Sequence, residues 1–146
     1  MSQTGHRSGL VAVIGPPNAG KSTLLNRFLE QKIAIVTPLP QTTRNRIQGI
    51  ITGPDYQMIL LDTPGLHQPR ETLNREMVRI ALEALAEADA ALFIADATDE
   101  PQKRDKRQEE YCGWLERASC PVVLALNKID LINREQLLLL IDWFRH

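Results

Sequence analysis

Residues 10–23 read LVAVIGPPNAGKST, and this stretch decides the fold. The apolar run at its start is typical of a strand that is buried on both faces. The pattern Gly, any four residues, Gly-Lys-Ser/Thr follows it from Gly15 to Ser22. A glycine-rich turn is the plain alternative, but a preceding strand and a following helix are the context that a phosphate-binding loop requires. The stretch therefore predicts a loop that binds the phosphates of a nucleoside triphosphate.

The residue types of this loop suit phosphate binding. Gly15 and Gly20 are expected to let the backbone curl so that successive N–H groups point into one concavity. The positive end of the helix that begins near Lys21 adds a favourable field. We expect Lys21 to contact the β- and γ-phosphates, and the Ser22 hydroxyl to ligate Mg²⁺. The predicted nucleotide-binding residues of the loop are Gly15, Pro16, Pro17, Asn18, Ala19, Gly20, Lys21, Ser22 and Thr23.

Outside the loop, short apolar runs alternate with segments of helical period. Strands are predicted at residues 10–14, 47–52, 56–61, 90–95 and 121–126, and helices at 21–30, 71–88, 101–118 and 134–146. This alternation predicts an α/β fold with a mostly parallel sheet and helices on both faces. The second and third strands are joined only by Gly53-Pro54-Asp55, which is too short for a parallel crossover. We therefore expect them to form one antiparallel pair.

Composition narrows the class of protein. The chain has 146 residues, a formal net charge of −1 and 43% hydrophobic residues, as one soluble globular domain would. Cys112 and Cys120 form neither a disulfide framework nor a metal-type spacing, which favours a reducing, intracellular setting. The apolar N-terminal run is too short for a signal peptide or a membrane span, so we expect no integral membrane segment. The near-zero charge argues against nucleic-acid binding through the whole surface, but it leaves a local basic patch open.

A second motif, Asn127-Lys128-Ile129-Asp130, follows the last predicted strand directly. Ligands of open α/β sheets bind beyond the carboxyl ends of the strands, so this motif and the phosphate loop should share one edge. The Asp130 carboxylate can accept two hydrogen bonds from guanine, and adenine lacks a matching pair of donors. We expect Lys128 to lie over the base and Asn127 to join this segment to the phosphate loop. A polar loop, or a helix start capped by Asp130, is the alternative.

A third motif, formed by Asp62, Thr63, Pro64 and Gly65, follows the third predicted strand. Asp62 is the expected magnesium carboxylate, and the Gly65 N–H can reach the γ-phosphate. This loop would then respond to the presence of the third phosphate. An ordinary turn is the alternative for these four residues, but their place at a strand end between the other two motifs favours the nucleotide-sensing role.

The loop at residues 37–46 is too long, and too rich in proline, for a mere connection. It contains Thr42 and Thr43, either of which could complete magnesium ligation and close on the γ-phosphate. The residues alone do not choose between the two threonines. Arg44 and Arg46 could contact phosphate, RNA or solvent.

Together, four segments resemble the GTPase domain of the Era family, within the Era-like class of translation GTPases. They are GPPNAGKSTLLN (15–26), PQTTRNRI (40–47), DTPGLH (62–67) and NKID (127–130). The resemblance implies a P-loop NTPase fold, the Ras-like G domain, which binds GTP and GDP with Mg²⁺ and hydrolyses GTP. It implies that Thr43 is the magnesium ligand of the pair, beside Ser22 and Asp62. It also implies a role in small ribosomal subunit assembly with rRNA as partner, a cytoplasmic location and, in the full-length family, a peripheral place at the inner membrane.

The resemblance also implies catalytic roles. Ras-like GTPases keep a water-orienting glutamine where this sequence has Leu66. Several members of the class instead position a potassium ion with the phosphate-loop asparagine, here Asn18, in place of an arginine finger. The implied catalytic residues are Lys21, Thr43, Gly65 and Asn18, and hydrolysis is expected to be slow and stimulated by K⁺.

The residues after Asp130 depart from the family pattern. Such GTPases carry a fifth, Ser-Ala-containing motif on a sixth strand, and Era proteins add a C-terminal RNA-binding KH domain. Residues 131–146 supply neither, so we expect 1–146 to be a single, C-terminally incomplete G domain. The leading function is a GTP-hydrolysing switch. The alternatives are a truncated guanine-nucleotide-binding module with weak affinity and little turnover, and a P-loop ATPase.

The last predicted helix is apolar on two faces. Leu137, Leu140, Ile141 and Phe144 form one apolar stripe, while Leu138, Leu139 and Trp143 lie off it. This pattern fits either burial within its own domain or contact with another chain or a missing segment. In the charge-dense helix before it, Tyr111, Trp114 and Leu115 are expected to face inward.

Overall fold

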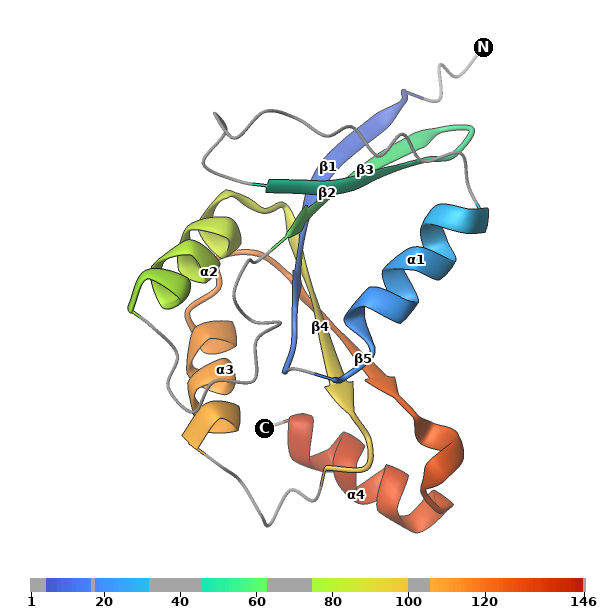
Figure 1. Cartoon of the computed structure of the whole chain (residues 1–146), viewed down its shortest axis with the longest axis vertical. Helices are drawn as coiled ribbons and strands as arrows, with labels where there is room; N and C mark the ends of the chain where they lie inside the picture. Colours follow the sequence, from blue (N-terminus) through green and yellow to red (C-terminus); the bar gives the residue numbers. More distant parts are fainter. Residues whose placement is uncertain (1–4, 17, 32–45, 63–74, 100–105, 146) are drawn as a thin grey trace.

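A five-stranded sheet forms the centre of the molecule (Figure 1). This computed structural model describes residues 5–16, 18–31, 46–62, 75–99 and 106–145. The strands are β1 (Arg7–Ile14), β2 (Arg46–Thr52), β3 (Tyr56–Asp62), β4 (Ala90–Asp96) and β5 (Val122–Asn127). They lie in the order β2-β3-β1-β4-β5, in which only the β2–β3 pair is antiparallel. The predicted mostly parallel sheet with one antiparallel pair is confirmed.

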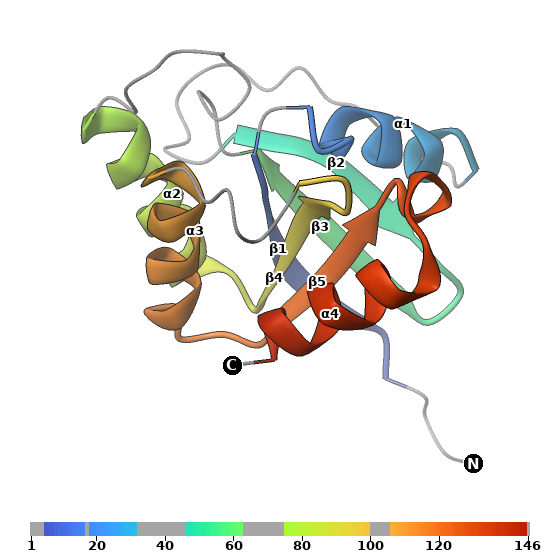
Figure 2. The same ribbon diagram turned by 90° about the horizontal axis from the view of Figure 1, so that it is seen from below.

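Helices cover both faces of this sheet, as the sequence predicts (Figure 2). They are α1 (Lys21–Gln31), α2 (Arg75–Glu87), α3 (Lys106–Glu116) and α4 (Arg134–Phe144), with a short 3-10 helix at Ile129–Leu131. The face with α1 is separate from the face with α2, α3 and α4. Within the described residues, no helix has both the length and the apolar character needed to cross a membrane.

The core has one apolar cluster on each face of the sheet. On the α1 side, Leu25 packs with strand residues that include Val13 and Ile94. On the other side, Tyr111 and Trp114 of α3 join Phe93 and the small residues of α2. Because β1 and β4 contribute residues to both clusters, their side chains are apolar on both faces. This is why their sequences read as nearly continuous apolar runs.

Helix α4 packs on the cluster that contains Phe93, but not with the whole stripe expected from its sequence. Leu140 is 4% exposed, and the Phe144 ring centroid lies 6.1 Å from that of Phe93. Ile141, on the same apolar stripe, is 47% exposed. The partly buried Trp143 instead packs against Phe144, with ring centroids 4.5 Å apart.

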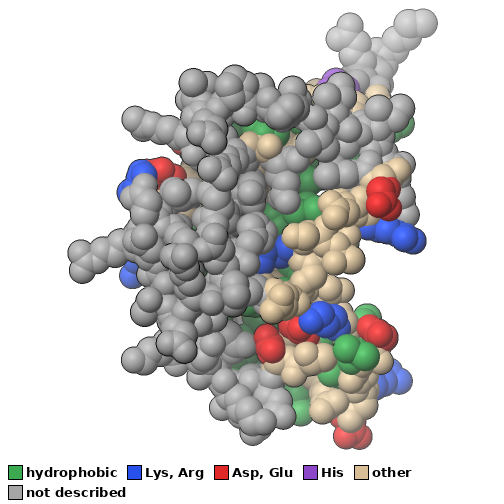
Figure 3. All heavy atoms as spheres, viewed as in Figure 1, with side chains coloured by type: hydrophobic (Ala, Val, Ile, Leu, Met, Phe, Trp, Pro, Cys, Tyr) green, Lys and Arg blue, Asp and Glu red, His purple; other side chains and the backbone are tan. Residues whose placement is uncertain are grey.

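Two leucines of α4 that lie off the apolar stripe are exposed. Leu138 is 58% exposed and Leu139 is 69% exposed. Ile129 and Leu131, in the 3-10 helix before α4, are exposed as well. In Figure 3 hydrophobic side chains appear at the surface in this region, between acidic and basic ones. The N-terminus of α4 is closed by a capping box, in which Asn133 and Gln136 each accept a hydrogen bond from the other's backbone N–H.

Candidate functional site

The carboxyl ends of the parallel strands meet at one edge of the sheet (Figure 1). At this edge β1 continues into the loop at Gly15, β4 into a turn at Asp96, and β5 into Lys128. The two predicted motifs, 112 residues apart at Gly15 and Asn127 in the sequence, are therefore neighbours in space. The edge is the place where open α/β sheets bind ligands.

The loop after β1 holds its lysine against its own backbone. The Lys21 side chain is buried, and its Nζ donates hydrogen bonds of 2.6 Å to the carbonyl oxygens of Gly15 and Pro16. Helix α1 begins directly after this turn, with a hydrogen bond of 2.9 Å from Leu24 N to Gly20 O. The ammonium group is thus fixed beside the N-terminus of α1, and both contribute positive potential to the same spot.

The two loop glycines have different structural roles. Gly20 adopts φ +97°, in the region that only glycine occupies readily. Gly15 has no positive φ; an added Cβ there would lie 2.2 Å from the carbonyl oxygen of Ile94. The absence of a side chain at Gly15 therefore lets β1 and β4 approach closely. Besides Gly20, the described loop residue with a left-handed backbone is Asn18, with φ 62°. The expectation that both glycines curl the backbone is correct for Gly20 only.

The segment after β5 is bonded to this loop. The Asn127 side-chain Nδ2 donates a hydrogen bond of 2.9 Å to the Ala19 carbonyl oxygen, which realises the predicted link. Lys128 has a left-handed backbone with φ 61° and ψ 30°. Asp130 is exposed on the 3-10 helix that follows.

A cleft of about 520 Å³ lies between the two segments. This volume is within the range of small-molecule sites, which is about 300–1,000 Å³. Its described lining combines phosphate-loop and base-motif residues: Asn18, Gly20, Lys21, Ser22, Thr23, Asn127 and Lys128. The Lys21 ammonium and the helix N-terminus favour an anionic ligand. Asp130 is not among the described residues that line this cleft.

Comparison with known proteins gives the family. A family model described as a 50S ribosome-binding GTPase matches residues 10–128 of the chain. The chain belongs to this GTPase family. The GTPase Era of Geobacter metallireducens is 49% identical over 134 residues, which are 92% of this chain and 44% of that protein.

Two solved Era structures are similar to this chain over 94% of its length. One is a variant of Aquifex aeolicus Era bound to GDP and AlF₄⁻, with 40% identity and a TM-score of 0.67. The other is Era in complex with MgGDPNP and nucleotides 1506–1542 of 16S ribosomal RNA, with 42% identity and a TM-score of 0.68. The chain covers 46% of each of these proteins, and thus spans less than half the length of the relatives it matches.

Several predicted site residues lie outside the described residues. They are Pro17, Thr43, Thr63, Pro64 and Gly65. Asp62 ends β3, and its backbone pairs with Arg46 of β2. The described part of the chain contains no group of three or more His, Cys, Asp or Glu side chains arranged to hold a metal ion. Ser22 is exposed and lines the cleft, so it is the one predicted metal ligand whose side chain is described.

Asp96, which sequence reasoning missed, pairs with a lysine that lines the cleft. Its carboxylate forms an ion pair with Lys128 Nζ and accepts hydrogen bonds of 2.9 Å and 2.6 Å from the backbone N–H and the hydroxyl of Thr98. Burial alone would raise the pKa of Asp96, but the hydrogen bonds from Lys128 and Thr98 together lower it below its ordinary value. The available signal was its position, since Asp96 is the first polar residue after a buried strand that ends at the site.

Proposed function

We propose that this chain binds GTP and GDP with Mg²⁺ in the cleft and hydrolyses GTP to GDP as a molecular switch. The observation that carries the proposal is the hydrogen bond from Asn127 to the Ala19 carbonyl. It joins the segment expected to bind the base to the loop expected to bind the phosphates, so that one nucleotide can contact both. The nucleotides bound to the two solved Era proteins support this assignment.

Charge and hydrogen bonding give the two ends of the cleft different preferences. At one end, the Lys21 ammonium and the N-terminus of α1 suit the β- and γ-phosphates. At the other, the Lys128 stem offers an apolar surface to a base, and Asp130 is proposed to accept hydrogen bonds from guanine. The choice of guanine over adenine therefore rests on Asp130, because adenine would leave this carboxylate unpaired.

The residues available at the phosphate end fit a magnesium ion. Ser22 places a hydroxyl at the cleft beside Lys21, and Mg²⁺ prefers hard oxygen ligands supplied by one or two side chains together with substrate phosphates. We propose that Ser22, Thr43 and Asp62 hold the ion. When bound, Mg²⁺ would neutralise charge on the β- and γ-phosphate oxygens.

The proposed reaction is direct attack of water on the γ-phosphate, without a covalent intermediate. Lys21 holds the phosphates and offsets charge that develops on them, and the Gly65 N–H is proposed to bind the γ-phosphate. Leu66 has no hydrogen-bonding group with which to orient the water. We therefore propose that Asn18, which lines the cleft, helps to place a K⁺ ion that supplies the missing positive charge. An arginine finger in that role is worth about 10³–10⁵ in rate.

We further propose that the chain acts in assembly of the small ribosomal subunit, in the cytoplasm. The support is its similarity to Era, one structure of which contains nucleotides 1506–1542 of 16S ribosomal RNA. A guanine-nucleotide-binding module with little turnover is the second candidate. The exposed position of Asp130, outside the lining of the cleft, favours it, because the base contact is then not preformed.

Nucleotide titrations test the proposed specificity. With Mg²⁺ present, fluorescent GDP should bind at least about a hundredfold more tightly than fluorescent ADP, because the adenine form leaves Asp130 unpaired. Asp130→Asn should shift the preference toward xanthine nucleotides, whereas Asp142→Asn, at an exposed carboxylate of α4, should not. Equal affinity for GDP and ADP would contradict guanine recognition and favour the ATPase alternative.

Single-turnover measurements test hydrolysis. We expect GTP cleavage to be slow in Na⁺ and faster in K⁺, and to be lost in Lys21→Ala. Asn18→Ala should remove the potassium effect, and both salts are compared at saturating GTP so that any loss of nucleotide affinity does not enter the comparison. Equal rates in the two salts would refute the role of K⁺, and binding without measurable cleavage in either salt would favour the binding module.

A further inference from the structure

Lys128 needs an external restraint to present a defined surface to a base. Its backbone is left-handed, a conformation that a non-glycine residue adopts only at a cost. Its four-carbon stem is flexible, and an unrestrained lysine retains most of its rotamer freedom. The side chain nevertheless lines the cleft and is only 35% exposed. Something therefore holds it there.

Asp96 supplies this restraint. Its Oδ2 pairs with the Lys128 ammonium, and its own side chain is only 11% exposed. The other carboxylate oxygen is fixed by two hydrogen bonds from Thr98, at 2.9 Å from the backbone N–H and 2.6 Å from the hydroxyl. A carboxylate that is held through both oxygens is a rigid anchor for the lysine.

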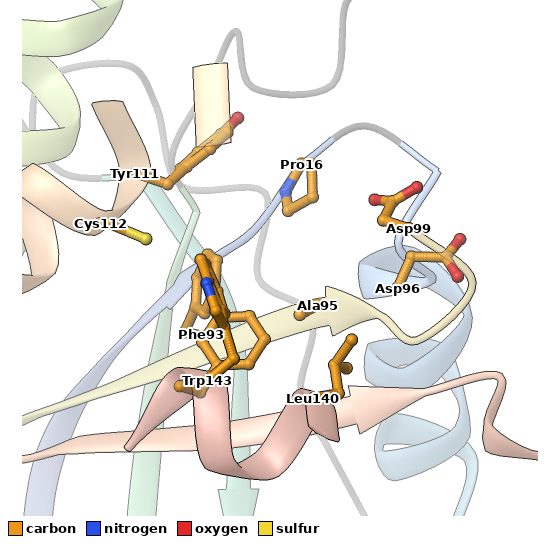
Figure 4. Close-up of a pocket in the computed structure, with 10 residues that line it drawn as sticks. Pro16, Phe93, Ala95, Asp96, Asp99, Tyr111, Cys112, Leu140 and Trp143 are labelled. Atoms are coloured by element: carbon orange, nitrogen blue, oxygen red, sulfur yellow. The ribbon is translucent and has the colours of Figure 1, made fainter. Parts of the chain in front are cut away.

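The backbone around the pair is fixed as well. Asp96 lies directly opposite Asn127 in the β4–β5 register, and Ala97 N donates a hydrogen bond of 2.9 Å to the Asn127 carbonyl oxygen. A turn closed by a 3.2 Å hydrogen bond from Asp99 N to Asp96 O follows β4. Figure 4 shows the Asp96 and Asp99 carboxylates side by side on this turn. Both partners of the ion pair therefore start from neighbouring strand ends.

We propose that Asp96 is a positioning residue of the guanine site, which holds the Lys128 ammonium so that the lysine stem forms a fixed wall for the base. Thr98 orients the Asp96 carboxylate for this purpose. The inference rests on the proposed binding of guanine nucleotide. It adds a residue outside the Asn-Lys-Ile-Asp motif, and it makes the base surface depend on the turn after β4.

A comparison of GDP with inorganic pyrophosphate isolates the base end of the cleft. Pyrophosphate can use the phosphate loop but has no base, so Asp96→Asn should leave its affinity unchanged or raise it slightly. The same variant should weaken GDP binding about three- to tenfold, the effect expected from one partly buried ion pair. Asp99→Asn is the matched control, because it removes a negative charge from the same turn. Loss of that charge should not weaken the binding of either anion.

A double-mutant cycle separates positioning from a general structural effect. Lys128→Met keeps an apolar stem but removes the ammonium, so Asp96→Asn should cost almost no further GDP affinity in that background. Equal losses in the Lys128 and Met backgrounds, or equal losses for GDP and pyrophosphate, would overturn the positioning role. Failure of the unaltered chain to bind GDP would instead overturn the proposed function, and this inference with it.

Discussion

Gly20 offers a sharp test of how the two segments of the site are joined. It has φ +97°, and an added Cβ would stand 2.1 Å from Asn127 Nδ2 and 3.3 Å from Asn127 Cγ. Gly20→Ala therefore combines a strained backbone with a steric clash. The clash falls on the side chain whose hydrogen bond to the Ala19 carbonyl links the loop to β5.

The expected cost can be assembled from these two terms. Alanine in a left-handed conformation costs about 1–2 kcal/mol relative to a permitted backbone. Displacement of Asn127 forfeits its hydrogen bond to Ala19, with a net value of about 0.5–1.5 kcal/mol. Gly20→Ala should therefore lower the free energy of unfolding by about 1.5–3.5 kcal/mol.

Urea unfolding of the nucleotide-free chain, followed by tryptophan fluorescence, measures this change. Gly113→Ala is the matched control, because a Cβ at this position in α3 meets no atom within 4 Å. It should stabilise the chain by about 0.5–1 kcal/mol through helix propensity. Asn127→Ala should cost less in the Gly20→Ala background than in the wild type, because the clash disappears with the amide. A Gly20→Ala variant as stable as the wild type, or an Asn127→Ala cost that is equal in both backgrounds, would refute this reasoning.

Other predictions concern the core, a titrating carboxylate and the close approach of two strands. In the same urea assay, Leu140→Ala should lower the free energy of unfolding by about 2–5 kcal/mol, and Leu139→Ala by less than about 0.5 kcal/mol. Losses of similar size in the two variants would contradict the orientation of α4. The pKa of Asp96 lies below 3.8, so its ionised form stabilises the fold above that pH, and the stability is lost as the pH falls through the lower folded-state value. The difference in free energy of unfolding between wild type and Asp96→Asn should thus be constant near neutral pH and shrink in acid. A difference that grows in acid would contradict this prediction. Gly15→Ala should lower the melting temperature, because the backbone of Ile94 blocks the new Cβ, whereas Gly113→Ala should not lower it. A Gly15→Ala variant that melts at the wild-type temperature would count against the close approach of the two strands.

Most of the fold could be predicted because its strands carry unambiguous patterns. The apolar runs of β1 and β4 need cover on both faces, and the short Gly53-Pro54-Asp55 connection permits only a hairpin. The helices of the α2–α3 side were also predictable, since residues such as Tyr111 and Trp114 recur on one face. These features are local, and local spacing is what a sequence displays directly.

The faces of α4 were harder to predict because nearly the whole helix is apolar. Periodicity puts Ile141 on the apolar stripe and Trp143 off it, whereas which of the two is buried depends on the shape of the surface beneath the helix. There the Phe144 ring packs edge-to-face against Phe93, and the Trp143 ring packs edge-to-face against Phe144. Complementarity to another segment is not written in the helix itself, so the sequence alone could not exclude Ile141.

The candidate site, too, could be predicted from the sequence only in part. The two motifs could be assigned to one sheet edge, because strand direction alone brings their ends together. The ion pair between Asp96 and Lys128 could not be predicted, since it depends on the register that sets Asp96 opposite Asn127. It also depends on a backbone conformation at Lys128 that propensity does not favour for lysine. The register between two strands and the strained backbone of a single residue are both set by the tertiary structure.

The strained residues show that the two halves of the site act as one unit. Within the described part of the chain, positive φ occurs at Asn18, Gly20 and Lys128, and all three line the cleft. Such conformations persist only where the surroundings over-determine them. Here Asn127 closes over Gly20 and bonds to Ala19, while β5 continues directly into Lys128. Relaxation of either segment would release the restraint on the other, so a ligand that bridges the cleft should stabilise both together.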